Sequence, residues 1–130
     1  MKNKTLYWLE LCDDDLITAK ALLDSSRFLH MGFFCHMIIE KSLKAVITEN
    51  TGEIPPKIHD LQKLAKMGNV SNELSDEQSE LLDKVMPLQI EARYPEYKEK
   101  ISQKLNKEYC DRLIKETEDF LCWIKQWLEK

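Results

Sequence analysis

The stretch from Phe33 to Ile47, FFCHMIIEKSLKAVI, constrains the fold of this chain more than any other segment. Ten of its fifteen residues are apolar, yet His36, Glu40 and Lys44 recur among them at every fourth position. A spacing of four places these three side chains on one side of an α-helix. A helix that is apolar almost all round is usually covered on both flanks, so we expect a second element to cover the side with the ionisable groups.

The three ionisable residues have two interpretations. In the first, His36, Glu40 and Lys44 form an exposed ladder of charges that contributes a few tenths of a kcal/mol per pair. In the second, they are polar groups at a subunit seam or cleft, where ionisable side chains are costly unless paired and often mark a site. The apolar neighbours Phe33 and Met37 favour the second. The cover is then another helix of the chain or a partner subunit, and a homodimer is our default prediction.

Helical spacing of apolar residues continues on both sides of this stretch. The predicted helices are residues 5–23, residues 33–50, a short helix within 59–67, a helix that follows Ser75 and carries apolar residues to Leu88, and a last helix capped by Asn106. Residues 24–32 supply turn formers and a glycine, and Gly52 is the expected C-terminal cap of the second helix. Ser75 and Gln78 have the spacing of a capping box. Residues 92–105 are polar and interrupted by Pro95, which predicts a mostly irregular connection.

These segments predict an all-α fold. No run of alternating apolar residues rich in Val, Ile and Thr supports a strand. We therefore expect an antiparallel up-and-down four-helix bundle with an additional short helix, formed by residues 1–130 as a single domain.

Composition excludes several classes of function. The net charge is -4 and the isoelectric point is near 5.4, which argues against broad, sequence-independent DNA binding. The longest stretch without a charged residue, Phe28 to Ile39, is far shorter than the roughly 20 apolar residues of a membrane span. No signal-peptide core is visible at the N-terminus. We expect a soluble, cytoplasmic protein whose four cysteines, Cys12, Cys35, Cys110 and Cys122, are small buried residues without disulfides.

Several motifs in order carry a resemblance to a known family. They are LITAKALL in the first helix, GFFCHMIIEKSLKAVI in the second, PPKIHDLQKL after a proline loop, ARYP after the fourth helix, and a closing amphipathic helix. This order resembles that of HEPN domains and spans nearly the whole chain from Asp15 onward. The resemblance implies a small helical bundle, generally dimeric, often encoded beside a minimal nucleotidyltransferase as toxin and antitoxin, and associated with nucleotide or RNA binding.

The chain departs from the family pattern at one point that concerns catalysis. Many HEPN proteins are metal-independent ribonucleases with an arginine followed, after about four to six residues, by a histidine, and two subunits join their sites at the dimer seam. Here no histidine follows Arg93 anywhere, and the residues at the corresponding distances from Arg27 are Gly32, Phe33 and Phe34. Without that imidazole, no obvious group near neutral pKa is available to move a proton from a ribose hydroxyl. We therefore predict no catalytic residues of the usual type.

The candidate ligand-binding residues outside the second helix lie in two motifs. Arg93 and Tyr94 can bind a phosphate and stack on a base, or they can be structural. Asp60 is expected to cap the short helix and His59 to anchor the loop before it, and we favour these structural roles over catalysis. The sequence predicts neither a metal ion nor another cofactor, because no third ligand accompanies His36 and Glu40 and the cysteines lack zinc spacing.

These observations favour one function and leave two alternatives. The favoured function is that of a binding or regulatory protein in a module of the toxin-antitoxin kind, a partner of a nucleotidyltransferase with affinity for nucleotide or RNA. The second is a ribonuclease with an unusual site, such as Arg93 with His36 or His59. The third is a helical scaffold that only dimerises.

Overall fold

The computed structural model describes residues 1–89 and 103–130, and every secondary-structure element within these two ranges is helical. The predicted all-α class is therefore confirmed. The α-helices are α1 (Asn3–Asp24), α2 (Phe28–Thr51), α3 (Leu61–Met67), α4 (Asp76–Val85) and α6 (Lys107–Leu128), and the short 3-10 segments are η1 (Ser71–Glu73) and η2 (Met86–Gln89).

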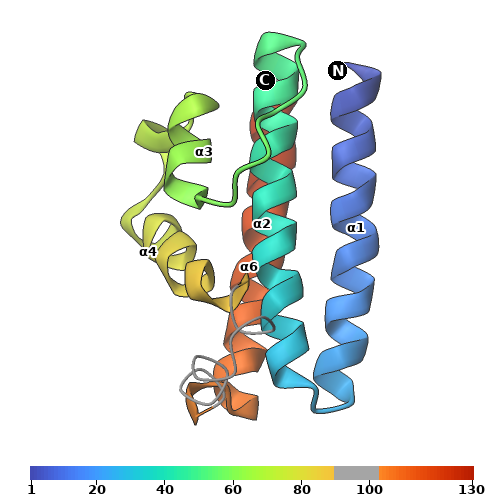
Figure 1. Ribbon diagram of the computed structural model, residues 1–130, viewed down its shortest axis with the longest axis vertical. Coiled ribbons are helices and arrows are strands. Elements are labelled where there is room, and N and C mark those ends of the chain that lie inside the picture. Colours follow the sequence, from blue (N-terminus) through green and yellow to red (C-terminus); the bar gives the residue numbers. More distant parts are fainter. Residues whose placement is uncertain (90–102) are drawn as a thin grey trace.

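Three long helices, α1, α2 and α6, pack along the long axis of the molecule, with α3 and α4 on the side of α2 away from α1 (Figure 1). α1 is antiparallel to α6, because Asp13 pairs with Lys125 at 2.6 Å and Lys20, further along α1, pairs with Glu118 at 2.9 Å. The predicted bundle is confirmed. Its fourth member, α4, has only 10 residues, and α3 and η2 therefore complete the cover over α2.

The turn between α1 and α2 is shorter than the sequence predicted. α2 begins at Phe28, whereas we expected Phe33, and residues 25–27 alone make the turn. The interpretation of Gly32 as a turn glycine is wrong, because Gly32 lies inside α2 and is buried. A Cβ at this position would lie 3.1 Å from Leu88 Cδ1 and 3.6 Å from Leu105 Cδ1. The glycine is therefore explained by close packing of η2 and of the segment before α6 against α2.

The predicted caps of the remaining helices are confirmed. Gly52 ends α2 with φ at 72°, a left-handed conformation that glycine adopts without a steric penalty. The Asp60 and Asn106 side chains accept backbone N–H groups at the starts of α3 and α6. Ser75 and Gln78 form the reciprocal capping box of α4.

The apolar stripes that the sequence predicted face the core. Helix α4 ends at Val85, and the stripe continues through η2. Five residues of the predicted stripes are only partly buried, namely Leu16, Leu23, Met86, Tyr109 and Leu128. The buried members of the stripes on α1, α3, α4, η2 and α6 are Leu9, Cys12, Ala19, Leu61, Leu64, Ala65, Leu81, Leu82, Val85, Leu88, Leu113, Phe120 and Ile124.

Among the described residues the four cysteines form no disulfide, as the sequence predicted. Cys12, Cys35 and Cys110 are buried, and burial raises the pKa of the Cys35 thiol to about 12. The prediction that every cysteine is buried is wrong for Cys122, which lies on the outer side of α6. None of the described helices combines the length and apolar composition needed to cross a membrane. Arg93, Tyr94 and most of the predicted connection 92–105 lie outside the described residues.

The packing around Gly32 generates a testable prediction. Gly32→Leu is expected to lower the free energy of unfolding by about 2 kcal/mol, because the added side chain must displace Leu88 and Leu105 from a filled core. Urea unfolding followed by circular dichroism measures this change. Ala21→Leu, on an exposed part of α1, is the matched control and should leave the stability nearly unchanged. An unchanged midpoint for Gly32→Leu would show that η2 does not approach α2 so closely.

Candidate functional site

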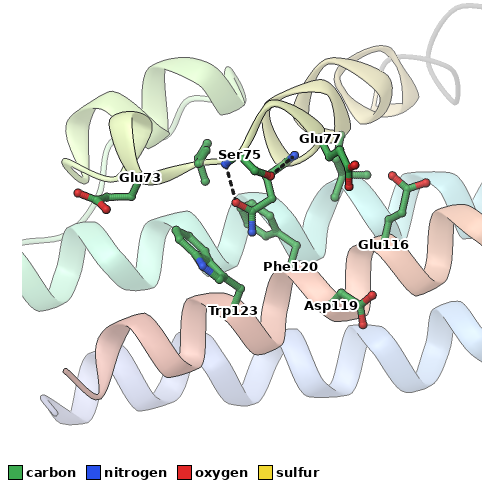
Figure 2. A pocket seen from close by; sticks show the side chains of 10 residues that line it. Glu73, Ser75, Glu77, Glu116, Asp119, Phe120 and Trp123 are labelled. Carbon is green, nitrogen blue, oxygen red and sulfur yellow. Dashed lines mark hydrogen bonds between the residues drawn. The ribbon is translucent and has the colours of Figure 1, made fainter.

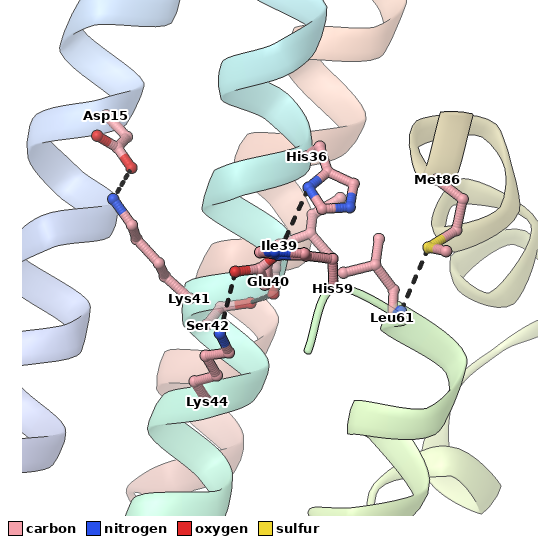
Figure 3. Close-up of polar contacts among 10 residues, drawn as sticks. All are labelled: Asp15, His36, Ile39, Glu40, Lys41, Ser42, Lys44, His59, Leu61 and Met86. Atoms are coloured by element: carbon pink, nitrogen blue, oxygen red, sulfur yellow. Dashed lines mark hydrogen bonds and ion pairs between the residues drawn. The ribbon is translucent and has the colours of Figure 1, made fainter. Parts of the chain in front are cut away.

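The polar side of α2 is buried within the chain itself. His36 is 0% exposed, Glu40 3% and Lys44 7%, which excludes the interpretation of an exposed charge ladder. Their cover comes from the segment between α2 and α3, which brings His59 against Glu40, and from η2 (Figure 3). The backbone N–H of Leu61 also donates to Sδ of Met86 at 3.3 Å, which holds the start of α3 against η2.

The apolar neighbours of these residues on α2 are covered to different degrees. Leu43 and Ile47 are buried, whereas Phe33 and Met37 are half-buried. The flank that suggested a twin subunit is therefore covered in large part by the chain's own segments. Homodimer formation stays a prediction, and the half-buried residues Phe33 and Met37 are the part of this flank still open to a partner.

The Glu40 carboxylate is the centre of a buried polar network. Its Oε1 lies 2.8 Å from Nδ1 of His59, and its Oε2 lies 3.1 Å from Nζ of Lys44. An ionised carboxylate only accepts hydrogen bonds, so Nδ1 of His59 carries the proton in this contact. The Glu40 charge is thus compensated by groups from α2 itself and from the loop, as a buried carboxylate requires.

His36 takes part in this network only weakly. Its Nδ1 lies 3.7 Å from Oε1 of Glu40, too far for a hydrogen bond, and neither ring nitrogen has a hydrogen-bond partner within the described part of the chain. Burial lowers the pKa of His36 from 6.5 to about 4, and the nearby Glu40 carboxylate and the His59 backbone offset only part of this effect. His36 is therefore a neutral imidazole at pH 7.

His59 is the solvent-facing member of the network. Its side chain is 44% exposed, whereas that of Glu40 is 3% exposed. The sequence predicted that His59 anchors the loop, and the contact with Glu40 provides that anchor. Its Nε2 is the ring nitrogen left to hydrogen-bond with solvent or with a ligand.

Asp60 lies beside His59 in sequence but has a different role. Its Oδ1 accepts the backbone N–H of Lys63 at 3.1 Å, so it caps α3 as the sequence predicted. Of the seven candidate residues, the structure brings together His36, Glu40, Lys44 and His59. It places Asp60 at the edge of this group, and Arg93 and Tyr94 lie outside the described residues.

The sequence did not reveal two of the polar contacts that position α2. Glu40 and His59 are 19 residues apart, and no periodicity links them. Lys41 Nζ reaches Asp15 Oδ2 on α1 at 2.6 Å, on the opposite side of α2 from the network (Figure 3). In the described ranges, no three His, Cys, Asp or Glu side chains are placed to hold a metal ion.

Comparison with known proteins identifies the class to which this bundle belongs. The HEPN domain model matches residues 5–127, nearly the whole chain. The protein therefore belongs to the HEPN family, and the resemblance seen in the sequence is confirmed. Comparisons with curated proteins and with solved structures found no match.

The buried network predicts an asymmetry between two carboxylate substitutions. Glu40→Gln is expected to lower the free energy of unfolding by about 3 kcal/mol, because it leaves the buried Lys44 ammonium without a countercharge. Asp111→Asn is the matched control, since it breaks an exposed i, i+4 pair with Lys107 and should change stability little. Urea unfolding of both variants measures the difference. Equal losses of stability in the two variants would mean that water reaches the Lys44 ammonium in solution.

The burial of His36 predicts a pH dependence of stability. The unfolded histidine takes up a proton near its ordinary pKa of 6.5, but the folded one does so only near 4. Between these values the unfolded state binds more protons, so the free energy of unfolding falls as the pH falls, by roughly 3 kcal/mol in total. His36→Leu should remove this contribution, which unfolding curves from pH 7 to pH 4 measure.

The same variant tests whether the imidazole has a partner in solution. At pH 7, His36→Leu is expected to be at least as stable as the natural protein, because it removes a buried polar ring without hydrogen bonds. Glu40, Lys44 and His59 face the same space and are present in both proteins, so the two proteins differ only in the imidazole. A clear loss of stability at pH 7 would contradict the assignment of His36 as unpartnered.

Proposed function

We propose that this HEPN protein is a binding or regulatory protein, a partner of a nucleotidyltransferase with affinity for nucleotide or RNA. The observation that carries the proposal is the complete burial of His36 in a neutral state. A general base must reach its substrate and titrate near the working pH, and His36 meets neither condition. Glu40 is likewise occupied by Lys44 and His59.

The candidate contact surface for nucleotide or RNA among the described residues is the exposed side of His59, and the sequence adds Arg93 and Tyr94 as further candidates. His59 presents half of an imidazole to solvent and is held in place by Glu40. An arginine matches a phosphate in a bidentate way, and an aromatic ring stacks on any base. Arg93 and Tyr94 are candidates from the sequence motif alone, because they lie outside the described residues.

A ribonuclease remains the second candidate because of one specific feature, the Glu40–His59 pair. A buried carboxylate that orients a partly exposed imidazole is an arrangement that general bases use. Cleavage of RNA also needs an acid for the leaving group, and among the described residues the other histidine beside this pair is the sealed His36. We therefore place binding ahead of cleavage.

The assembly is the third part of the proposal. The family's frequent pairing with a minimal nucleotidyltransferase supports a partner of that class in a toxin-antitoxin module, and its usual dimeric state supports a homodimer. Sedimentation equilibrium of the purified chain measures the dimer. Inspection of the neighbouring open reading frame, followed by co-purification of its product with this protein, tests the predicted partner.

The proposal predicts binding of RNA without cleavage. Fluorescence anisotropy of a labelled single-stranded RNA should rise with added protein, and gel analysis at several pH values should show intact RNA. Arg93→Ala is expected to weaken binding about tenfold by removing a phosphate contact. Arg112→Ala is the matched control, because Arg112 is exposed on α6 and pairs only with the exposed Glu108 in the described structure.

Two other outcomes would replace the proposal. Cleavage that is lost in His59→Gln, which keeps a hydrogen-bond donor for Glu40 but cannot titrate, would establish the ribonuclease. If neither RNA nor nucleotides bind the protein or raise its thermal unfolding midpoint, the scaffold is favoured. A ligand that binds the folded state must raise this midpoint.

A further inference from the structure

A groove separates the beginning of α4 from the middle of α6, and it shares no residue with the network around Glu40 (Figure 2). Its volume is about 500 Å³, which is sufficient for a large side chain with the backbone on either side of it. Phe120 and Trp123 of α6 form an aromatic floor, with Phe120 almost fully buried and Trp123 partly exposed. The groove therefore offers apolar surface that the chain itself does not cover.

Carboxylates surround this floor from both sides. Glu73 and Glu77 come from η1 and the first turn of α4, whereas Glu116 and Asp119 come from α6. In the described part of the chain Glu73 and Glu77 have no ion-pair partner, while Glu116 pairs with Lys84 at 3.4 Å and Asp119 with Lys115 at 3.3 Å. Both lysine pairs are exposed, so they contribute little and exchange readily with another cation. The groove is thus an aromatic floor inside an excess of negative charge.

We infer that this groove binds a basic, arginine-bearing segment of a partner protein. The guanidinium group suits both parts of the groove, because it stacks on an indole face and donates paired hydrogen bonds to a carboxylate. A phosphate would face the unpaired carboxylates Glu73 and Glu77 and be repelled. An apolar ligand would cover these carboxylates without pairing them, which costs free energy. Charge complementarity therefore selects a basic protein segment over nucleic acid.

This inference concerns a second surface and does not depend on the proposed RNA contacts at His59. The floor residue Trp123 and the acidic residue Glu73 come from segments far apart in sequence, and both line the groove that forms where α4 packs against α6. RNA and a basic peptide are expected to bind the protein independently. Loss of one activity would therefore leave the other measurable.

The test uses a short fluorescent peptide of alternating arginine and alanine and its glutamate counterpart. Anisotropy titrations of the full chain at low salt should show binding of the arginine peptide only. The double variant Glu73→Gln/Glu77→Gln should weaken this binding about tenfold, and Trp123→Ala about fivefold. Glu10→Gln/Glu108→Gln, which removes the same charge from exposed positions outside the groove, should change the affinity less than twofold.

Each other outcome overturns the inference. If the arginine peptide does not bind, an arginine-bearing segment is excluded as the occupant of the groove. Equal losses of peptide affinity in the two double variants would mean that the peptide is attracted by net charge alone. Weaker RNA binding in Glu73→Gln/Glu77→Gln would make the groove a nucleic-acid surface. A dimer that dissociates in that variant would make the occupant a second copy of the chain. Both glutamates are exposed, so the double variant keeps its fold, which circular dichroism verifies.

Discussion

The all-round burial of α2 is the constraint on which the rest of this structure depends. From Ile38 to Thr48, Lys41 is the only position of the helix that is not buried. α1 and α6 cover the apolar side, and the remaining side is left to a loop, the short α3 and η2. Because α4 is too short to cover α2 alone, the loop after α2 must fold back along it.

The return of that loop explains why ionisable groups occur on so apolar a helix. Glu40 accepts hydrogen bonds from Lys44 on its own helix and from His59 on the loop, so one carboxylate holds the cover in place. A buried charge pair is weak evidence for added stability, but a charge that loses its partner is costly. The network therefore favours a single position of the loop over alternatives in which Glu40 remains unpaired.

The same arrangement shapes the chemistry available to this HEPN protein. The imidazole that the motif places on α2 is sealed and neutral, whereas the one on the loop is exposed and oriented by a carboxylate. A surface for ligands is consequently expected at the loop and not on the helix. The acidic, aromatic groove at α4 and α6 shares no residue with this loop, so the proposed protein contact and the proposed nucleic-acid contact use different surfaces of the domain.

Much of the fold follows from local sequence. The caps at Gly52, Asp60, Ser75 and Asn106 lie where residue type and spacing predict, because each cap is an interaction between residues close in the chain. Gly32 and Cys122 were misjudged because their environments depend on segments distant in sequence: η2 packs over Gly32, and nothing in the described structure buries Cys122.

The sequence by itself determined the helices, their caps and the family, since periodicity, capping and motifs act over a few residues. Only the tertiary structure decided that the polar side of α2 is buried by its own chain and that Glu40 meets His59. Periodicity can show that a helix has two faces, but it does not say which segment will cover each of them. That choice depends on loop length and on the volumes of side chains far apart in sequence, which a local pattern does not contain.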